Sequence, residues 1–366
     1  MSERDTVLVT GAGGLVGAEV VARLTAAGRP VVAVLHTNGR IVRNDGTDLE
    51  GVETVRGDIR LAGLGLATET VTELGARVGM IVHSAATTAF DATTTDYEEL
   101  NVRGTAHAVE LARRWDVPLV HVSTAYVCGM RAGVIAESEL DVGQAFGNGY
   151  EDSKFRAERV VRSTPGLRWA IVRPGIVTGA ADTGVIREYK NLYTVVKLIV
   201  EGKLRSLPGR YDATIAAAPV DFVADVITAA VTDFDAAAGG TFHAVGADAL
   251  SLREISDVFA EYPSFHVATF VPEVSFEAAD LEPLEREYFQ RIGSLYTSYF
   301  ARRPVFDTTA TRALLGRECP ASGKHYLRKL LDYCVESGYL GEPLPSVTEV
   351  LAGFASRADT GAGGHR

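Results

Sequence analysis

Two side chains one helical turn apart, Tyr150 and Lys154, are the residues of this sequence best suited to proton transfer. A free tyrosine has a pKa of about 10, and an ammonium group nearby favours the phenolate and so eases the release of the proton. Thr124 adds a hydroxyl at the end of an apolar run. A phenol and a hydroxyl that face one carbonyl oxygen can stabilise the charge that a hydride transfer places on it. We therefore predict that Thr124, Tyr150 and Lys154 are catalytic.

Ser123 and a second tyrosine–lysine pair, Tyr193 and Lys197, are alternatives to this set. Ser123 offers a competing hydroxyl, and the second pair repeats the Tyr-x-x-x-Lys spacing. Only Tyr150 follows an apolar run that ends in Ser-Thr and precedes the next such run, at 169–173. The order along the chain therefore favours the first pair. Its own alternative is an amphipathic helix surface without chemistry.

Apolar runs and helical patterns alternate through the first 180 residues. Continuous apolar runs rich in β-branched residues are typical of parallel strands that helices cover on both faces. We predict an α/β fold with a doubly wound parallel (Rossmann) sheet and a smaller, mostly helical C-terminal lobe. The strand-like runs lie at 7–9, 31–35, 80–82, 119–122 and 169–172, with helical patterns at 15–24 and 97–114.

The pattern loosens after Gly179, which indicates a change of domain. The predicted dinucleotide-binding core spans 1–180, and later segments at about 211–248 return to it. A substrate-binding lobe spans 181–355, followed by a frayed tail at 356–366. In this second half we expect helices at 185–201, at 222–231 and from Ser251, a strand at 241–245, and an aromatic-rich, largely helical region at 275–340.

Three glycines with the spacing G-x-x-G-x-x-G stand between the first apolar run and the first helical pattern. Such glycines permit a tight turn, a close approach of backbone N–H groups to a diphosphate, and close packing of helix on strand. The N-terminus of the following helix directs a partial positive charge toward the same diphosphate. We therefore predict that Gly11, Gly14, Leu15, Val16 and Gly17 bind a dinucleotide. A purely structural turn is the alternative.

The end of the second apolar run indicates which dinucleotide is bound. His36 follows this run, at the place where NAD enzymes usually carry an Asp or Glu that holds the ribose hydroxyls. Arg40 and Arg43 follow and could hold a 2′-phosphate, so the sequence favours NADPH, with NADH not excluded. Solvated loop charges are the alternative for both arginines. Asp58, after the predicted third strand, could accept a hydrogen bond from the adenine amino group.

The fourth apolar run ends in His83-Ser84-Ala85-Ala86. Small side chains let the backbone pass beside a bound cofactor, so we predict that Ser84, Ala85 and Ala86 contact it. We interpret His83 as a packed histidine and not as a catalytic base.

Composition excludes several classes of protein. The chain has 366 residues, 46% of them hydrophobic, which is enough for a full core. A net charge of −11 argues against nucleic-acid binding. Three scattered cysteines predict neither a disulfide framework nor a metal site. Without a signal peptide or an apolar run of about 20 residues, we expect a soluble, cytoplasmic protein.

Several phrases of the sequence resemble the extended short-chain dehydrogenase/reductases, over about residues 5–260. Within that superfamily the chain is most similar to the branch of thioester reductases and fatty acyl-CoA reductases. It departs from that branch at His36, where an arginine is common. The phrases that carry the resemblance are Gly57-Asp58-Ile59 with Leu64-Gly65-Leu66, His83-Ser84-Ala85-Ala86 with Phe90-Asp91, Asn101-Val102-Arg103-Gly104-Thr105, Val122-Ser123-Thr124-Ala125-Tyr126-Val127, Arg173-Pro174-Gly175-Ile176-Val177-Thr178-Gly179, and Pro219-Val220-Asp221-Phe222-Val223-Ala224.

The resemblance implies NADPH-dependent reduction of an acyl thioester, linked to CoA or to the phosphopantetheine arm of a carrier protein. The product is an aldehyde, in some members reduced onward to an alcohol. The resemblance maps the catalytic hydroxyl onto Thr124 and gives Lys154 a second role, binding the nicotinamide ribose. It also adds Ile59, Asn101, Pro174, Gly175, Ile176 and Val177 to the expected cofactor contacts.

Other functions remain open at this point. A ketoreductase, an alcohol dehydrogenase or a nucleotide-sugar epimerase or dehydratase uses the same Thr-Tyr-Lys set, and a protein that only binds the dinucleotide is a third class. A nucleotide sugar would need a diphosphate site in the second lobe, for which Arg187, Arg205 and Arg210 are candidates.

A carrier protein is usually acidic, so a carrier-dependent enzyme would present a basic surface to it. Such clusters are more often solvated faces, and we assign no partner site from the sequence. The candidate residues are Lys324, His325, Arg328 and Lys329, with Arg302 and Arg303.

Overall fold

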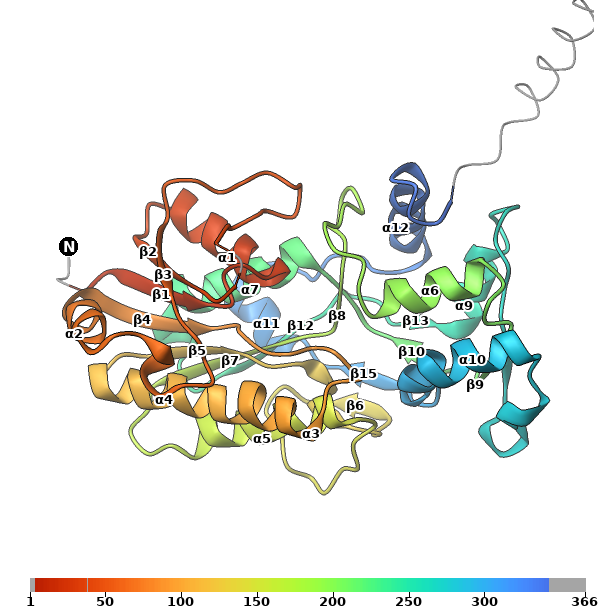
Figure 1. Cartoon of the computed structure of the whole chain (residues 1–366), viewed down its shortest axis with the longest axis horizontal. Helices are drawn as coiled ribbons and strands as arrows, with labels where there is room; N and C mark the ends of the chain where they lie inside the picture. Colours follow the sequence, from red (N-terminus) through yellow and green to blue (C-terminus); the bar gives the residue numbers. More distant parts are fainter. Residues whose placement is uncertain (1–3, 38, 342–366) are drawn as a thin grey trace, which may run out of the picture.

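Seven parallel strands form one sheet in the computed structural model of the chain, which describes residues 4–37 and 39–341 (Figure 1). The predicted doubly wound sheet is thereby confirmed. Six of its strands are almost entirely buried, because helices cover both faces. In spatial order the strands are β12 (Thr241–Ala244), β7 (Trp169–Pro174), β5 (Leu119–Val122), β4 (Val78–His83), β1 (Thr6–Thr10), β2 (Val31–Leu35) and β3 (Glu53–Arg56).

Alternate side chains of the strands enter two separate apolar layers. Val7 and Val9 pack with helices on one face, whereas Leu8 packs with helices on the other. The first layer is covered by α1 (Leu15–Ala26), α7 (Val220–Thr232) with the short α8 (Phe234–Ala237), and α11 (Thr309–Leu315); the second is covered by α2 (Thr68–Arg77), α4 (Gly104–Trp115) and α5 (Gly149–Ser163).

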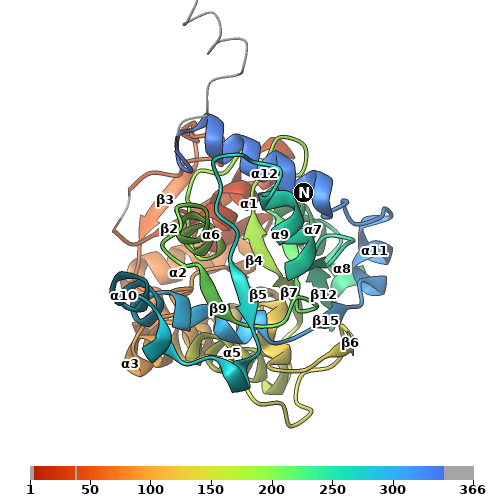
Figure 2. The same ribbon diagram turned by 90° about the vertical axis from the view of Figure 1, so that its right-hand side faces the viewer.

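A smaller lobe lies at one end of the sheet, to the right in Figure 1 and toward the viewer in Figure 2. It has its own apolar cluster, rich in tyrosine and phenylalanine. Its elements are α6 (Leu192–Val200), β9 (Ser206–Pro208), β10 (Thr214–Ile215), β13 (Leu250–Ser251), α9 (Leu252–Phe259), β14 (Thr269–Val271), α10 (Pro283–Arg291), the 3-10 helix η6 (Gly293–Phe300) and α12 (Lys324–Glu336). Two further strand pairs, β8 (Ile176–Thr178) with β11 (Ala217–Pro219) and β6 (Gly133–Ile135) with β15 (Pro304–Phe306), complete the fold.

The order of the strands determines where a ligand can bind. β1 lies between β2 and β4, so the direction in which strands are added reverses at this point. Open α/β sheets bind ligands outside the carboxyl ends of the strands at such a switch point. Here those ends are Thr10 and His83, which are directly paired.

Three elements differ from the sequence-based expectation. The helix expected at 185–201 begins only at Leu192, because Asn191 before it has φ 51° and ψ −109°, which no helix accommodates. The helix expected at 97–114 contains a π-helical stretch, Tyr97–Arg103, after the short α3 (Thr94–Asp96). The region at 275–340 includes a strand, β15, besides its helices. The tail at 356–366 lies outside the described residues.

Candidate active site

A cavity of about 290 Å³ lies at the carboxyl ends of the central strands, between the sheet and the smaller lobe. Its size is that of a small-molecule site. The sheet side contributes the glycine turn and the strand ends, and the lobe contributes aromatic side chains. Of the predicted site residues, those that line the cavity are Gly11, Gly14, Leu15, Val16, Gly17, Ser84, Ala86, Thr124, Tyr150, Lys154, Pro174, Gly175, Ile176 and Val177.

The glycine turn has no room for side chains. Gly11 has a φ of 71°, and a Cβ there would lie 2.6 Å from the backbone nitrogen of Ala85. A Cβ on Gly17 would lie 2.1 Å from the carbonyl oxygen of Gly11. Helix α1 then begins at Leu15, and Gly14 before it provides no side-chain cap. The first N–H groups of α1 therefore face the cavity without a side-chain acceptor, as a diphosphate site requires.

Helix α5 carries both Tyr150 and Lys154 into the cavity. Its first turn is fixed by Asn148, whose side chain accepts a hydrogen bond from the backbone of Glu151 at 3.0 Å. Lys154 is 2% exposed, and its Nζ donates to the carbonyl oxygen of Val122 at 2.8 Å. The ammonium group is therefore anchored at the end of β5, beside the cavity.

Burial raises the pKa of Tyr150 to about 12, and a hydrogen bond with the Thr124 hydroxyl acts in the lowering direction. The phenol is therefore protonated at neutral pH and can donate. Burial lowers the pKa of Lys154 to about 8, with the carboxylate of Glu158 opposing that shift. The lysine thus changes charge within the range of ordinary assays.

Ser123 also lines the cavity, but its hydroxyl donates to the carboxylate of Glu158 at 2.9 Å. Glu158 is fully buried and forms an ion pair of 2.6 Å with Arg173. The hydrogen bonds of the Thr124 hydroxyl are longer, since it donates to the carbonyl oxygen of Pro174 at 3.3 Å and accepts from the backbone nitrogen of Tyr126 at 3.3 Å. Of the two hydroxyls, Thr124 is therefore the one more easily turned toward a substrate.

The pKa of Lys154 predicts a decline of kcat/KM as the pH rises above about 8. Deprotonation removes the positive charge that favours the phenolate of Tyr150, so the rate should fall about tenfold per pH unit beyond this pKa. The measurement is a pH–rate profile with saturating cofactor.

Lys197, the lysine of the second Tyr-x-x-x-Lys, provides the control. Its ammonium stacks on the ring of Tyr339, 4.5 Å from the ring centre, and it does not line the cavity. Lys197→Met should leave the profile unchanged. A wild-type profile that stays flat to the pKa of an ordinary lysine would contradict the assignment.

The residues expected at the adenosine end lie outside the cavity lining, around the loop after β2. His36 Nε2 is 3.5 Å from the Asp58 carboxylate. Arg60 donates several hydrogen bonds to the same carboxylate, and these outweigh the effect of burial on its charged form. Hydrogen bonds from Arg60 lower the pKa of Asp58 to about 2. Arg40 is ion-paired with Asp48. The carboxylate expected to bind adenine is thus engaged by an arginine that the sequence analysis did not single out.

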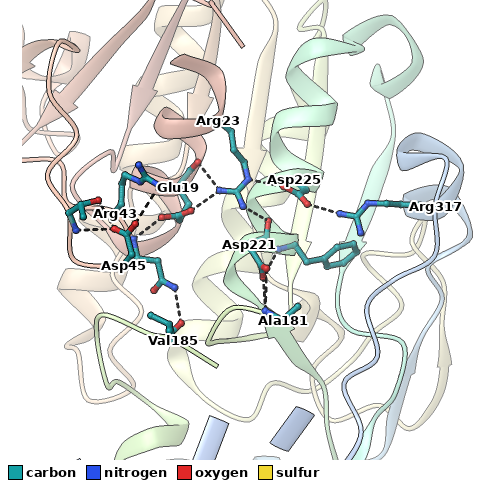
Figure 3. A network of polar contacts seen from close by, with 12 residues as sticks. Glu19, Arg23, Arg43, Asp45, Ala181, Val185, Asp221, Asp225 and Arg317 are labelled. Carbon is teal, nitrogen blue, oxygen red and sulfur yellow. Dashed lines mark hydrogen bonds and ion pairs between the residues drawn. The ribbon is translucent and has the colours of Figure 1, made fainter. Parts of the chain in front are cut away.

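Contacts with α1 and with the segment at 181–187 hold this loop in place (Figure 3). The backbone nitrogen of Asn44 donates to Glu19 of α1, and its side chain donates to the carbonyl of Val185. Arg43 lies 3.4 Å from Asp45 in the same loop. A Cβ on Gly13 would lie 3.7 Å from the carbonyl oxygen of Arg40, so the loop packs directly against the glycine turn.

Ion pairs join the helices behind the turn. Arg23 of α1 donates to Glu19 and to Asp225 of α7, and Asp225 also accepts from Arg317. Asp221 accepts from the backbone of Ala181. Figure 3 shows this chain of contacts from α1 across α7. It fixes the glycine turn relative to the segment that leads into the smaller lobe.

Three residues expected to contact the cofactor do not line the cavity and have structural contacts instead: Asn101, Ile59 and Ala85. The Asn101 amide is fully buried and bonds to the backbone of Thr87 and to the hydroxyl of Ser153, which links the segment after β4 to α5. Ile59 packs into the apolar layer beneath α4.

His83 is buried, with Nδ1 2.9 Å from the Thr10 hydroxyl. Burial lowers its pKa to about 3, so the imidazole is neutral. Its ring stacks on that of His121, 5.7 Å away, and it does not line the cavity. Its position is that of a packed histidine.

An aromatic wall opposite the catalytic side chains was not assigned from the sequence. Phe90 lies 5.7 Å from the ring of Tyr150 and 5.4 Å from that of Tyr299. The wall comprises Phe90, Tyr126, Tyr296, Tyr299 and Phe300. For Tyr296, Tyr299 and Phe300 the signal in the sequence was the aromatic enrichment at 275–340, which does not say which rings face the site.

Arg302 ties this wall to the catalytic helix. Its guanidinium lies 4.6 Å from the ring centre of Tyr126 and 4.3 Å from that of Tyr299, and it binds both carboxylate oxygens of Glu151, the residue after Tyr150. Arg302 is 2% exposed. It is therefore not part of a basic surface, contrary to its inclusion among the candidates for one.

Four of the other basic candidates also have protein partners. Arg303, Lys324 and Arg328 form ion pairs with acidic neighbours, and Lys329 donates to the carbonyl oxygen of Ala181. The arginines considered for a sugar diphosphate have protein partners too and do not line the cavity. Arg187 donates to the carbonyl of Val42, Arg205 to that of Gly202, and Arg210 to Asp212.

Among residues 4–37 and 39–341, no helix has the length and apolar character needed to span a membrane. Within the same ranges, no cluster of three histidine, cysteine, aspartate or glutamate side chains is arranged to hold a metal ion.

Comparison with known proteins places residues 9–227 in a family model described as Male sterility protein. Fatty acyl-CoA reductase wat of Drosophila melanogaster is 30% identical over 213 residues, which cover 50% of this chain and 41% of that protein. Peramine synthetase A of Epichloe festucae is 30% identical over 208 residues, 50% of this chain and 7% of that protein. The chain thus spans less than half the length of these curated relatives.

Among solved structures, the terminal R domain from the myxalamid PKS-NRPS biosynthetic pathway is similar over 94% of both chains. The TM-score is 0.77 and the sequence identity is 23%. This likeness shows a shared fold that includes the smaller lobe as well as the sheet.

Proposed function

Because the chain belongs to the Male sterility protein family of NAD-binding proteins, we propose that it reduces an acyl thioester to an aldehyde with NADPH. The observation that carries the proposal is the composition of one cavity. The cavity brings the Thr124 hydroxyl, the Tyr150 phenol and the Lys154 ammonium opposite the glycine turn and the uncapped start of α1. A site that only held a dinucleotide would not need a half-buried phenol beside a hydroxyl.

Each of the three catalytic residues has its own role in the reaction. When bound, the nicotinamide cofactor supplies a hydride to the thioester carbonyl carbon. Thr124 and Tyr150 donate hydrogen bonds to the carbonyl oxygen as it gains negative charge, and Tyr150 then gives it a proton. Lys154 stabilises the phenolate that Tyr150 becomes. The resulting hemithioacetal loses its thiol as the C–S bond breaks, which leaves the aldehyde.

The adenosine end supports NADPH as the reductant. No carboxylate stands directly after β2, and two arginines lie on the loop that packs against the glycine turn. Each pairs with an aspartate of the same exposed loop, Arg40 with Asp48 and Arg43 with Asp45, so a 2′-phosphate would take the place of these carboxylates. We expect the double substitution Arg40→Ala/Arg43→Ala to raise KM for NADPH about tenfold, the loss of about one charged hydrogen bond, with little change for NADH.

Steady-state kinetics with both cofactors test this prediction. Arg77→Ala is the control, because Arg77 is a partly exposed arginine that also pairs with a carboxylate, Glu53, but at the other end of the sheet. Equal effects of the double substitution on NADPH and NADH would contradict a 2′-phosphate contact.

A substrate panel tests the reaction itself. Oxidation of NADPH is followed with acyl-CoAs, carrier-linked acyl thioesters, aldehydes and UDP-sugars, and we expect turnover of thioesters. Turnover of aldehydes alone would replace the proposal with an alcohol dehydrogenase or ketoreductase. The nucleotide-sugar alternative is disfavoured by the protein partners of Arg187, Arg205 and Arg210.

The thioester is presented either by CoA or by a carrier protein. The resemblance to a terminal R domain of a PKS-NRPS pathway supports a carrier. Direct comparison of the same acyl group on both carriers separates the two, because a carrier-dependent enzyme has a much lower KM for the protein-linked form.

A further inference from the structure

A second, smaller cavity lies inside the lobe, between α6, α9 and β14. The volume open to the centre of a water molecule is about 30 Å³, more than the roughly 10–15 Å³ that one water needs. Apart from one serine, every side chain around it is apolar. The lining residues are Leu192, Val195, Val196, Ile199, Ile215, Leu252, Ile255, Ser256, Phe259, Ala268, Phe270 and Phe300.

This cavity shares a wall with the catalytic cavity. Leu192, Ile215 and Phe300 line both. Ile215 is 2% exposed, Phe300 is 3% exposed and Leu192 is half-buried, so most of the shared wall lies in the interior. The two cavities therefore adjoin, with the reacting groups in the first and a lining that is apolar except for Ser256 in the second.

The lining defines the chemistry of an occupant. The Ser256 hydroxyl, the lone polar side-chain group around the cavity, already donates to the carbonyl of Leu252 at 2.8 Å within α9. A polar ligand would find no partner here and would lose its hydrogen bonds to water. Apolar cavities of this kind stay dry and bind hydrocarbon. An aliphatic chain is the class of ligand that fits.

We propose that this cavity receives the distal end of a straight aliphatic acyl chain whose thioester lies at Thr124 and Tyr150. The proposal rests on the function proposed above. The chain would pass the side chains of Leu192 and Phe300, and the half-buried residues Val196 and Ile255 would set the longest chain accommodated. Side chains of the smaller lobe thus determine which acyl chain length is accepted, and they are distinct from the residues that take part in the reduction.

The test is the dependence of kcat/KM on chain length, measured with a series of straight-chain acyl thioesters. For the wild type we expect a gain of about fourfold for each methylene that enters the cavity, then a plateau or decline. Ile255→Phe fills the cavity and should end the gain at shorter chains. Ile255→Ala enlarges it and should extend the gain to longer chains.

Opposite shifts of the two variants exclude general damage to the lobe. Val258→Ala is the matched control, because Val258 is buried in the same helix but does not line the cavity; it should lower stability and leave the chain-length profile unchanged. If Ile255→Phe does not fold, Val196→Phe replaces it. An identical profile for the wild type and both Ile255 variants would overturn the proposal.

Binding without turnover separates this proposal from the proposed function. Pantetheine thioethers with alkyl chains of increasing length cannot be reduced, and calorimetry measures their affinity without cofactor. A gain in affinity with chain length that Ile255→Phe removes supports the cavity even if no thioester is turned over. Reduction of thioesters with no chain-length effect in either assay leaves the reaction standing and rejects the cavity.

Discussion

Replacement of Tyr150 by phenylalanine should lower kcat by about 10²–10⁴, the contribution of a positioned general acid. The substitution removes one oxygen and leaves the ring, so the contact with Phe90 remains and the cavity keeps its shape. Lys154 keeps its hydrogen bond to Val122. Affinity for NADPH should therefore be unchanged. The measurements are kcat with a thioester substrate and the dissociation constant of NADPH from protein fluorescence.

Tyr193→Phe provides a matched control for this prediction. Tyr193 belongs to the second Tyr-x-x-x-Lys, is also buried, and accepts a hydrogen bond from the backbone of Gly179 at 2.9 Å. Its loss should lower stability and leave kcat close to that of the wild type. Comparable losses of kcat in the two variants would mean that Tyr150 has only a structural role, and the reductase mechanism would be wrong.

Those parts of the site that rest on local chemistry could be predicted from the sequence. The turn at Gly11 and Gly17 depends on positions where no side chain fits, and this requirement is visible in the glycine spacing. The four-residue separation of Tyr150 and Lys154 places them on one face of a helix wherever that helix lies. The order of the motifs along the chain then predicted that they share one site, because strands of a parallel sheet end at a common edge.

Those parts that depend on long-range packing could not be predicted. Phe90, Tyr126 and Tyr299 are far apart in the sequence, and their convergence on one wall follows from how the lobe docks on the sheet. The residues at 185–191 carry a helical pattern but end in an unusual backbone conformation at Asn191. Arg302 was interpreted as a surface charge for the same reason: its partners lie on other elements.

Replacement of Arg302 by methionine should lower the free energy of unfolding by about 3–5 kcal/mol, because it leaves the buried carboxylate of Glu151 without its counter-charge. The substitution also removes the cation that lies over the rings of Tyr126 and Tyr299. Since Glu151 follows Tyr150 in the first turn of α5, we expect kcat to fall as well. Denaturant unfolding and steady-state kinetics measure the two effects.

The neighbouring arginine is the control for this prediction. Arg303 is about half exposed and pairs with Asp212 at the surface, so Arg303→Met should change stability by no more than about 1 kcal/mol. Adding Glu151→Gln to Arg302→Met removes the unpaired charge and should recover part of the lost stability, which a loss of packing alone would not allow. Equal effects of the Arg302 and Arg303 substitutions would show that the buried ion pair does not hold the lobe against the catalytic helix. In that case, the position of Tyr150 would depend on α5 and its cap alone.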